Sequence, residues 1–358
     1  MDSPTILAIK PEYIQTKIGL YQFGNLCFLK NIVHPFDEVK KFAKNTDQYL
    51  YRTDAIMEEL QNSGINLSDI KVIMARGGLL KPIASGSYEV SEAMMHDLRN
   101  SPVGRHSVNI GGLIANEITK RIQGSKAYIA DPAVVDEMDD IARYTGWPNI
   151  KRKSIFHALN HKYIARTFAE SQQKTYEELN LIVAHLGDGI SIGAHKKGRV
   201  VDVNQAFDGE GPFSLERAGT IPVGELVKLC YSGIYSEEQV MAKVRYEGGM
   251  FAYLGTSSYY ELEKAELIQN EAVLKIFEAM AYQVAKYIGS MNMVFIENVD
   301  AILITGTLAN SKWFVNKILE RVKKIAPVHF FPGEDVLDAL AMNGLRILNK
   351  EAEAKIYK

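Results

Sequence analysis

A glycine turn between two apolar runs is the clearest candidate for chemistry in the sequence. Gly187, Asp188 and Gly189 separate the runs LIVAHL and ISIGAH, and His185 lies near the end of the first run. Asp-Gly between such runs predicts a β-hairpin. Glycines also let backbone N–H groups approach a phosphate, and a polar side chain beside the turn could then reach a terminal phosphoryl group. Both a plain hairpin and a phosphate site fit this stretch.

Two arginines occupy positions from which they could reach a ligand. Arg76 ends the predicted strand KVIMA and precedes two glycines, so its guanidinium could project into the crevice where open α/β sheets bind ligands. Arg217 lies among turn residues in GPFSLERAG. The plain alternatives are a solvated charge at a Gly-Gly turn for Arg76 and a surface ion pair with Glu216 for Arg217. The sequence leaves both alternatives open.

Two acidic residues stand at the ends of predicted elements. Asp131 follows the strand KAYIA and precedes Pro132. Its carboxylate could orient a substrate group or hold a water of Mg²⁺, or it could cap a helix that starts shortly afterwards. Glu334 precedes the predicted closing helix, where it could lie near bound magnesium or stabilise the helix dipole.

A histidine pair lies in SIFHALNHKYIAR. His157 and His161 are four residues apart, so on a predicted helix they share one face. This spacing is compatible with zinc, but the neighbouring glutamate of metalloprotease motifs and a nearby third ligand are missing. A pair that packs or forms hydrogen bonds is therefore the favoured interpretation.

A strand, a glycine and a helix follow one another in AILITGTLANS. The buried strand ends at Gly306, and Thr307 follows it. Such an element is common at nucleotide sites, although one glycine is less specific than a full glycine fingerprint.

The predicted elements alternate as in layered α/β proteins. The chain has 358 residues, of which 47% are hydrophobic and 23% charged, and this length suits two cores. Three strand-like runs, a predicted helix over residues 37–62 and a strand ending at Arg76 come first, and the same order of elements restarts at Leu181. We therefore expect an internal duplication, with two similar α/β lobes on either side of a cleft that could hold a nucleotide. The expected lobes are residues 1–155, to which a helix within 333–358 returns, and residues 156–332.

Charge and composition exclude several classes of partner. The net charge of -2 provides no broad attraction for nucleic acid or for an anionic membrane. Cys27 and Cys230 are far apart in the sequence, so neither a disulfide framework nor a metal-thiolate site is expected. No apolar run approaches the roughly 20 residues that span a bilayer. These features predict a cytoplasmic protein.

The motifs together resemble a known family. HLGDGISIGAH, FHALNHKYIAR, GPFSLERAGTIPVGEL, ARGGLLKPI, IADPAVVDEM, AYLGT and FPGEDVLDAL resemble, in order and over almost the whole chain, the motif series of the butyrate kinases, the short-chain fatty acid branch of the acetate kinase family. The resemblance implies a duplicated actin-like ATPase (ribonuclease H-like) fold whose two lobes hold ATP. It also implies that a carboxylate oxygen attacks the γ-phosphorus of ATP in line, which produces an acyl phosphate and ADP, or that the reverse reaction occurs.

The resemblance further implies roles for individual residues. Arg76 and Arg217 would bind the carboxylate and the phosphoryl oxygens through planar donors, and His185 would hydrogen-bond the γ-phosphoryl group. The motifs imply the remaining roles. His157 would be a second active-site histidine, Asp131 would orient the substrate, and Glu334 would lie near Mg²⁺. Gly306 and Thr307 would lie near adenosine, and the residues at the phosphates would be Thr16, Lys17, Gly187, Asp188 and Gly189. The implied partners are a small-molecule carboxylate or acyl phosphate and further copies of the chain, as a dimer or larger homo-oligomer.

The opening phosphate loop departs from the family pattern. The family's first strand normally ends Asn-Pro-Gly-Ser-Thr-Ser-Thr-Lys, whereas here residues 10–17 read KPEYIQTK. Glu12 replaces a glycine, and Tyr13 and Ile14 replace small hydroxyl residues, which adds bulk and negative charge. Two alternatives to an active carboxylate kinase are therefore considered. One is a weak or silent paralogue that binds a nucleotide, ligand or partner, and the other is a kinase for an alcohol, which would need a carboxylate base aimed at the hydroxyl.

Overall fold

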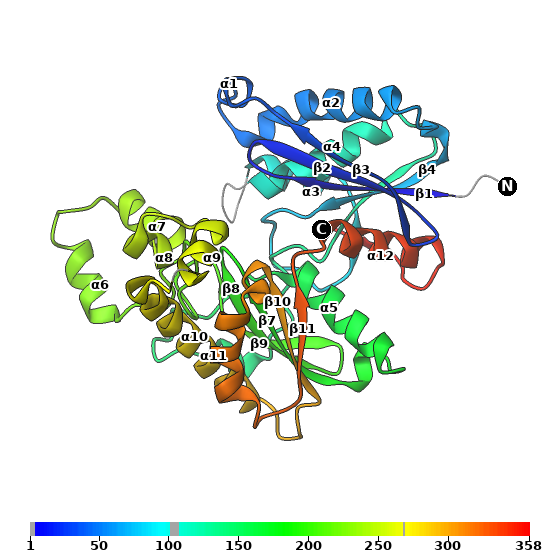
Figure 1. Cartoon of the computed structure of the whole chain (residues 1–358). Helices are drawn as coiled ribbons and strands as arrows, with labels where there is room; N and C mark the ends of the chain where they lie inside the picture. Colours follow the sequence, from blue (N-terminus) through cyan, green and yellow to red (C-terminus); the bar gives the residue numbers. More distant parts are fainter. Residues whose placement is uncertain (1–3, 101–106, 268) are drawn as a thin grey trace. The chain divides into compact units, whose positions relative to one another are not determined.

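The chain folds into two compact α/β units, each built on one sheet (Figure 1). The computed structural model describes residues 4–100, 107–267 and 269–358. The first unit comprises Met1–Val135, Ala158–Asn160 and Asp335–Lys358, and the second comprises Asp136–His157 and His161–Glu334.

The first sheet combines an antiparallel meander of β1, β2 and β3 with the parallel strands β1, β4 and β6, and β5 then runs antiparallel to β6. Its strand order is β12-β5-β6-β4-β1-β2-β3. β4 pairs in parallel with both β1 and β6. The apolar run of β1 is buried almost throughout, as expected for a strand that is covered on both faces. The strands are β1 (Thr5–Pro11), β2 (Gln15–Gln22), β3 (Asn25–Val33), β4 (Ile70–Arg76), β5 (Ser87–Glu89), β6 (Lys126–Ala130) and β12 (Lys355–Ile356).

The second sheet repeats this topology. Its order is β11-β10-β7-β8-β9, with β7, β8 and β9 antiparallel and β7, β10 and β11 parallel. This order matches β6-β4-β1-β2-β3 of the first sheet strand for strand, which confirms the predicted duplication. The strands are β7 (Asn180–Leu186), β8 (Ile190–Lys196), β9 (Arg199–Val203), β10 (Ala301–Gly306) and β11 (Val328–Pro332).

Helices cover the first sheet. The C-terminal helix α12 packs against β1 and β4, and Gly344 allows this close approach because a Cβ there would lie 2.9 Å from side-chain atoms of Ile6 and Met74. The helix predicted over residues 37–62 is interrupted, since Asn45–Gln48 forms a short 3₁₀ turn. Asn, Thr and Asp side chains in this turn favour local hydrogen bonds over a continuous helix. The helices are α1 (Phe36–Val39), α2 (Tyr49–Asn62), α3 (Glu92–Asn100), α4 (Ile110–Thr119) and α12 (Val336–Leu348).

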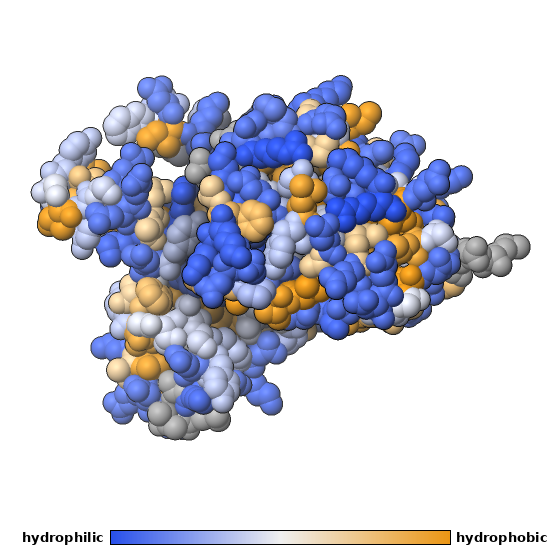
Figure 2. All heavy atoms as spheres, turned by 90° about the horizontal axis from the view of Figure 1, so that it is seen from above, coloured by the Kyte–Doolittle hydropathy of each residue, from blue (hydrophilic) through white to orange (hydrophobic). Residues whose placement is uncertain are grey.

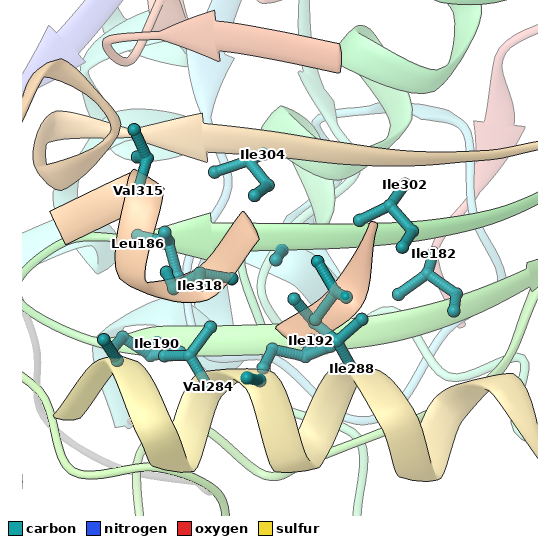
Figure 3. Packing of buried hydrophobic residues seen from close by; sticks show 14 of the residues in the cluster. Ile182, Leu186, Ile190, Ile192, Val284, Ile288, Ile302, Ile304, Val315 and Ile318 are labelled. Carbon is teal, nitrogen blue, oxygen red and sulfur yellow. The ribbon is translucent and has the colours of Figure 1, made fainter. Parts of the chain in front are cut away.

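The long helix α10 (Glu271–Asn292) forms part of the second core. Val284 and Ile288 on α10 are fully buried and face Ile190 and Ile192 of β8 (Figure 3). This face of α10 therefore belongs to the hydrophobic core. The other helices of this unit are α5 (Ala158–Ser171), whose first residues are grouped with the first unit, α6 (Val223–Cys230), α7 (Glu237–Arg245), α8 (Gly249–Leu254), α9 (Tyr259–Leu267) and α11 (Lys312–Val322).

The boundary between the units lies before the expected residue 155. Residues 136–157 belong to the second unit because they bond to β9 and the loop after it. The N–H of Asp139 donates to the carbonyl of Val201 at 2.9 Å, and Arg152 donates to Asp202 at 2.8 Å and to Glu210 at 2.6 Å.

The surface carries scattered apolar groups on a mostly hydrophilic face (Figure 2). Within the described residues, no helix is long and apolar enough to cross a membrane. Cys27 and Cys230 are both free and exposed.

Candidate active site

Three separate motifs meet at the carboxyl edge of the second sheet. β7, β10 and β11 are parallel, and their register pairs His185 with Thr305 and Gly306 with Pro332. The glycine turn after β7, residues 306–307 after β10 and Glu334 after β11 therefore lie at one edge. This edge is the place where open α/β sheets bind ligands.

His185 and Glu334 form a contact beside the glycine turn. The Nε2 atom of His185 lies 2.9 Å from Oε1 of Glu334, and the His185 side chain is 1% exposed whereas that of Glu334 is 27% exposed. A Cβ on Gly187 would lie 3.2 Å from the same Nε2 atom, so the turn passes close to the histidine. The N–H of Gly187 donates to the carbonyl of Gly189 at 3.2 Å, so this donor is used inside the turn.

Arg217 lies directly over Gly189. A Cβ at position 189 would be 2.0 Å from Nη1 of Arg217 and 2.5 Å from its Cζ, so a side chain there would displace the guanidinium. The guanidinium also lies 5.3 Å from the ring centroid of Phe207. The loop carrying Arg217 is joined to the turn, because the hydroxyl of Ser214 donates to the carbonyl of Asp188 and accepts from the N–H of Arg217. The turn and the arginine therefore position each other.

Glu216 bonds to a serine, whereas the ion pair with Arg217 was one of the alternatives that the sequence left open. Its carboxylate accepts a hydrogen bond from the hydroxyl of Ser257 at 2.9 Å. Burial, together with the nearby charge of Asp188, raises the pKa of Glu216.

His157 stacks on His185. The ring centroids are 3.8 Å apart and the ring planes differ by 17°. His157 occupies the N-cap position of α5 rather than a position within the helix. Burial first, and then the neighbouring His185 and Arg217, hold the pKa of His157 well below its ordinary value. The ring is therefore neutral at neutral pH, in spite of the opposing effect of Glu334.

Gly306 has a structural reason to be glycine. Its φ of 95° lies in the left-handed region, and a Cβ would be 2.2 Å from the carbonyl oxygen of Leu186. Its N–H donates to the carbonyl of Gly333 at 3.1 Å, and the N–H of Gly333 donates back at 3.0 Å. Thr307 begins a 3₁₀ turn at this edge. The adenosine contacts of Gly306 and Thr307 stay predictions.

The first unit holds Arg76 and Asp131 at neighbouring strand ends. The register pairs Arg76 of β4 with Ala130 of β6, so Asp131 follows one residue beyond this pair. Asp131 is 1% exposed, and its carboxylate accepts hydrogen bonds from the Ser85 hydroxyl at 2.6 Å and the Gly86 N–H at 2.7 Å. Residues 132–138, all of them described, contain no helix. The helix-cap interpretation of Asp131 is therefore wrong, and its carboxylate fixes a loop.

Arg52 organises the opening loop, and sequence reasoning missed it. The side chain is 2% exposed and donates to the carbonyls of Glu12 at 2.9 Å, Tyr13 at 2.7 Å and Gln15 at 3.0 Å. It also donates to the hydroxyl of Thr16 at 3.0 Å. Thr16 is fully buried, and its hydroxyl also lies 2.9 Å from Nε2 of His34. The Thr16 hydroxyl is therefore engaged inside the unit.

The charges of the opening loop are paired with one another. Nζ of Lys10 lies 2.9 Å from the Glu12 carboxylate and Nζ of Lys17 lies 4.0 Å from it. Burial raises the pKa of Glu12, but hydrogen bonds from Lys10 and Gln15 outweigh it and lower the pKa overall. Tyr13 is 56% exposed and Ile14 is 44% exposed, so neither side chain is buried in the unit.

The comparisons with known proteins agree with this architecture. The model of the acetokinase family matches residues 145–330. Butyrate kinase 1 of Clostridium acetobutylicum is 46% identical over 99% of this chain and 99% of its own length, and butyrate kinase 2 of the same organism is 44% identical with the same coverage. Among solved structures, the acetate kinase of Porphyromonas gingivalis superposes with a TM-score of 0.80 at 17% identity, covering 97% of this chain and 100% of that chain. The acetate kinase of Entamoeba histolytica follows with a TM-score of 0.75 at 14% identity, covering 95% and 99%.

The duplicated sheets define an actin-like ATPase fold, and the full-length relatives at 44–46% identity make the chain one of the kinases with this fold. More particularly, the chain belongs to the acetokinase family.

Proposed function

We propose that this protein is an ATP-dependent carboxylate kinase that phosphorylates a short-chain fatty acid, butyrate or a branched analogue, reversibly. The observation that carries the proposal is the 46% identity to a butyrate kinase over 99% of both chains. This full-length similarity does not favour the alternative of a silent paralogue, although residues 10–17 depart from the family pattern.

The reaction forms one bond and breaks one. A carboxylate oxygen of the fatty acid attacks the γ-phosphorus of ATP, and the bond from that phosphorus to the β,γ-bridging oxygen breaks, so that ADP leaves. Negative charge spreads over the transferring group, and catalysis consists chiefly of positioning and electrostatic stabilisation. Arg217, fixed over Gly189, would donate to the phosphoryl oxygens, and His185 would form a further hydrogen bond to them.

Glu334 and Asp188 supply oxygen donors suited to Mg²⁺. Magnesium in kinases is held by one or two carboxylates together with phosphate oxygens and waters, so a complete protein cage is not required. The described residues contain no cluster of three possible ligands, but the Glu334 side chain is 27% exposed and Asp188 is exposed at the turn. This donor set fits a magnesium ion that arrives with ATP. When bound, the ion would neutralise charge on the phosphates.

Residues of the first unit complete the proposal. Arg76, half-buried at the end of β4, would bind the carboxylate of the fatty acid. Asp131 would hold the loop at residues 85–86 in place. Lys17, with a 41% exposed side chain, would contact the nucleotide, whereas Thr16 would act through the backbone that Arg52 fixes.

We place the enzyme in the cytoplasm as a homo-oligomer. Exposed apolar side chains on and after α6 support self-association, among them Val223 at 72% and Tyr231 at 88% exposure. Light scattering coupled to size-exclusion chromatography would give the number of copies.

Trapping with hydroxylamine tests the proposed reaction. Purified protein with Mg-ATP and butyrate or isobutyrate should form a hydroxamate, because hydroxylamine captures acyl phosphates but not the phosphate esters that an alcohol kinase makes. Protein that is folded by circular dichroism yet gives no hydroxamate above the blank would refute a carboxylate kinase. Arg217→Ala is the matched control, because it should keep the fold and lose the signal.

A further inference from the structure

A chain of buried hydrogen bonds leads away from His157. Its Nδ1 atom lies 2.9 Å from Oγ of Ser191, and the same oxygen lies 2.9 Å from Nε2 of His161. Nδ1 of His161 lies 3.2 Å from Nε2 of His195, and Nδ1 of His195 lies 2.7 Å from the hydroxyl of Tyr176. We call Ser191, His161, His195 and Tyr176 the histidine relay.

The spacing of residues along β8 and along α5 brings the relay residues together. Ser191, Gly193 and His195 alternate along β8, so they share the face of the sheet that α5 covers, and His161 lies on α5 one turn after His157. Gly193 leaves room for the rings, because a Cβ there would lie 3.4 Å from both nitrogens of the His161–His195 hydrogen bond.

The rings of the relay are neutral. His161 and His195 are both 0% exposed. Burial is the first cause that holds the pKa values of His157, His161 and His195 well below their ordinary value. A neutral imidazole carries one proton, so each ring donates through one nitrogen and accepts through the other.

Ser191 links His157 to the other residues of the histidine relay. Its oxygen already accepts from the backbone N–H of His157 at 3.4 Å, and its other contacts among the described residues are the two ring nitrogens. The hydroxyl proton must therefore point to one ring nitrogen, while the other ring donates to the oxygen. As a result, once the donor and acceptor of one hydrogen bond in the relay are fixed, the donors and acceptors of all the others follow.

Tyr176 sets that direction. A phenol donates more strongly than it accepts, because its oxygen lone pair is delocalised into the ring, whereas the bare nitrogen of imidazole is a good acceptor. When Tyr176 donates to Nδ1 of His195, the protons of His195 and His161 reside on Nε2, and Ser191 donates to Nδ1 of His157. His157 then carries its proton on Nε2.

We propose that the histidine relay consists of positioning residues that hold His157 as a neutral imidazole with its proton on Nε2, ready to donate to an anionic oxygen of the substrates. Nε2 of His157 makes no hydrogen bond to any residue that the structure describes, and the His157 side chain is only partly buried. A neutral ring also suits the position of His157, which stacks on His185 near Arg217, because the positive charge of Arg217 would repel an imidazolium. The proposal rests on the proposed kinase function for its ligand, but the position of the proton is a property of the protein alone.

The proton position can be measured without turnover. In ¹⁵N-histidine spectra of the full chain, with His157 assigned through a His157→Gln variant, we expect a protonated Nε2 and a bare Nδ1 for His157, His161 and His195. A proton on Nδ1 of His157 in the unaltered protein would overturn the proposal. If a protein with the expected spectrum gave no hydroxamate, the kinase function would be refuted, but the proposed proton position would stand.

Tyr176→Phe removes the donor at the end of the relay and keeps the ring. We expect part of the His157 population to move its proton to Nδ1. We also expect kcat to fall by about 10- to 100-fold, as it does when a residue that fixes the tautomer of a metal-ligating histidine is removed. Tyr88→Phe is the matched control, since Tyr88 is 5% exposed and Tyr176 4% exposed, and the Tyr88 hydroxyl donates to the carbonyl of Ala84 in the first unit at 2.8 Å. An unchanged spectrum and an unchanged kcat in Tyr176→Phe would contradict the proposal.

A conservative variant separates positioning from packing. The amide of His161→Gln can donate to Ser191 and accept from His195, so we expect kcat within about threefold of the unaltered protein. His161→Leu fills similar space without these groups and should lose activity as Tyr176→Phe does. Equal activity of the glutamine and leucine variants would show that the hydrogen bonds have no role.

Discussion

At the scale of single residues, the guanidinium of Arg217 is held directly over Gly189. Because Arg217 is proposed to stabilise charge on the transferring phosphoryl group, Arg217→Ala should lower kcat by about 10³- to 10⁵-fold. Arg217→Lys should recover little, since an ammonium lacks the planar pair of donors. Steady-state hydroxamate assays measure both effects.

Arg245 offers a control for Arg217, because both guanidiniums lie over the ring of Phe207. Arg245 bonds instead to Asp208 at 2.6 Å, so Arg245→Ala should change kcat by less than about threefold, as expected for a residue that acts mainly in a partly exposed ion pair. Equal losses in the two variants would show that packing on Phe207, rather than the charge of Arg217, matters.

Gly189 gives a second test of the same geometry. In Gly189→Ala the new methyl group would displace the guanidinium, whose nearest atom lies 2.0 Å from the Cβ position. The displaced group is the end of a flexible side chain, so we expect a normal melting temperature and a kcat reduced at least about 100-fold, in keeping with the sensitivity of catalysis to small misplacements. Gly224→Ala, with open space around its Cβ position, should leave both quantities unchanged. A Gly189→Ala enzyme of normal kcat would remove Arg217 from its proposed role.

Sequence reasoning found residues that belong to local motifs and missed those that depend on distant contacts. His185, Gly189 and Glu334 stand next to strands and turns that the sequence itself marks. Arg52 contacts a loop some forty positions earlier, and nothing in the surrounding helix sequence points to that loop. The relay could have been suspected from one signal, the alternation of Ser191, Gly193 and His195 along a strand.

At the scale of elements, the repeated strands were easier to predict than the helix limits. The hairpin at Asp188-Gly189 and the repeated strand pattern follow from period-two alternation and glycine turns, and both are present. Residues 37–62 have the composition of one helix but form two, separated by the 3₁₀ turn Asn45–Gln48, where Asn, Thr and Asp have low helix propensity.

The loop between β1 and β2 depends on Arg52 for its shape. Arg52→Ala would remove the hydrogen bonds that the guanidinium donates to three carbonyls and to the Thr16 hydroxyl, so the free energy of unfolding should fall by about 2–4 kcal/mol. Urea unfolding followed by circular dichroism measures this loss. The matched control is Arg121→Ala, whose partner Asp54 is largely exposed, and it should cost less than about 1 kcal/mol. Similar losses in the two variants would argue against a special role for Arg52.

At the scale of the whole molecule, each unit buries histidines in neutral form. His34 lies in the first unit, where burial and then the charge of Arg52 lower its pKa to about 4. His157, His161 and His195 lie in the second unit with pKa values held well below the ordinary range. The unfolded chain takes up these protons near pH 6.5, before the folded chain does. Stability from these groups is therefore present above pH 6.5 and is lost as pH falls toward the folded pKa values.

His34 allows the size of this effect to be isolated. Between pH 7 and pH 5, where most carboxylates stay ionised, a histidine shifted from 6.5 to about 4 should remove about 2 kcal/mol from the free energy of unfolding. His34→Gln can keep the hydrogen bond to Thr16 without titrating, so its stability should fall by about 2 kcal/mol less than that of the unaltered protein over this interval. If His34→Gln instead loses as much stability as the unaltered protein, proton uptake at His34 makes no contribution to acid unfolding.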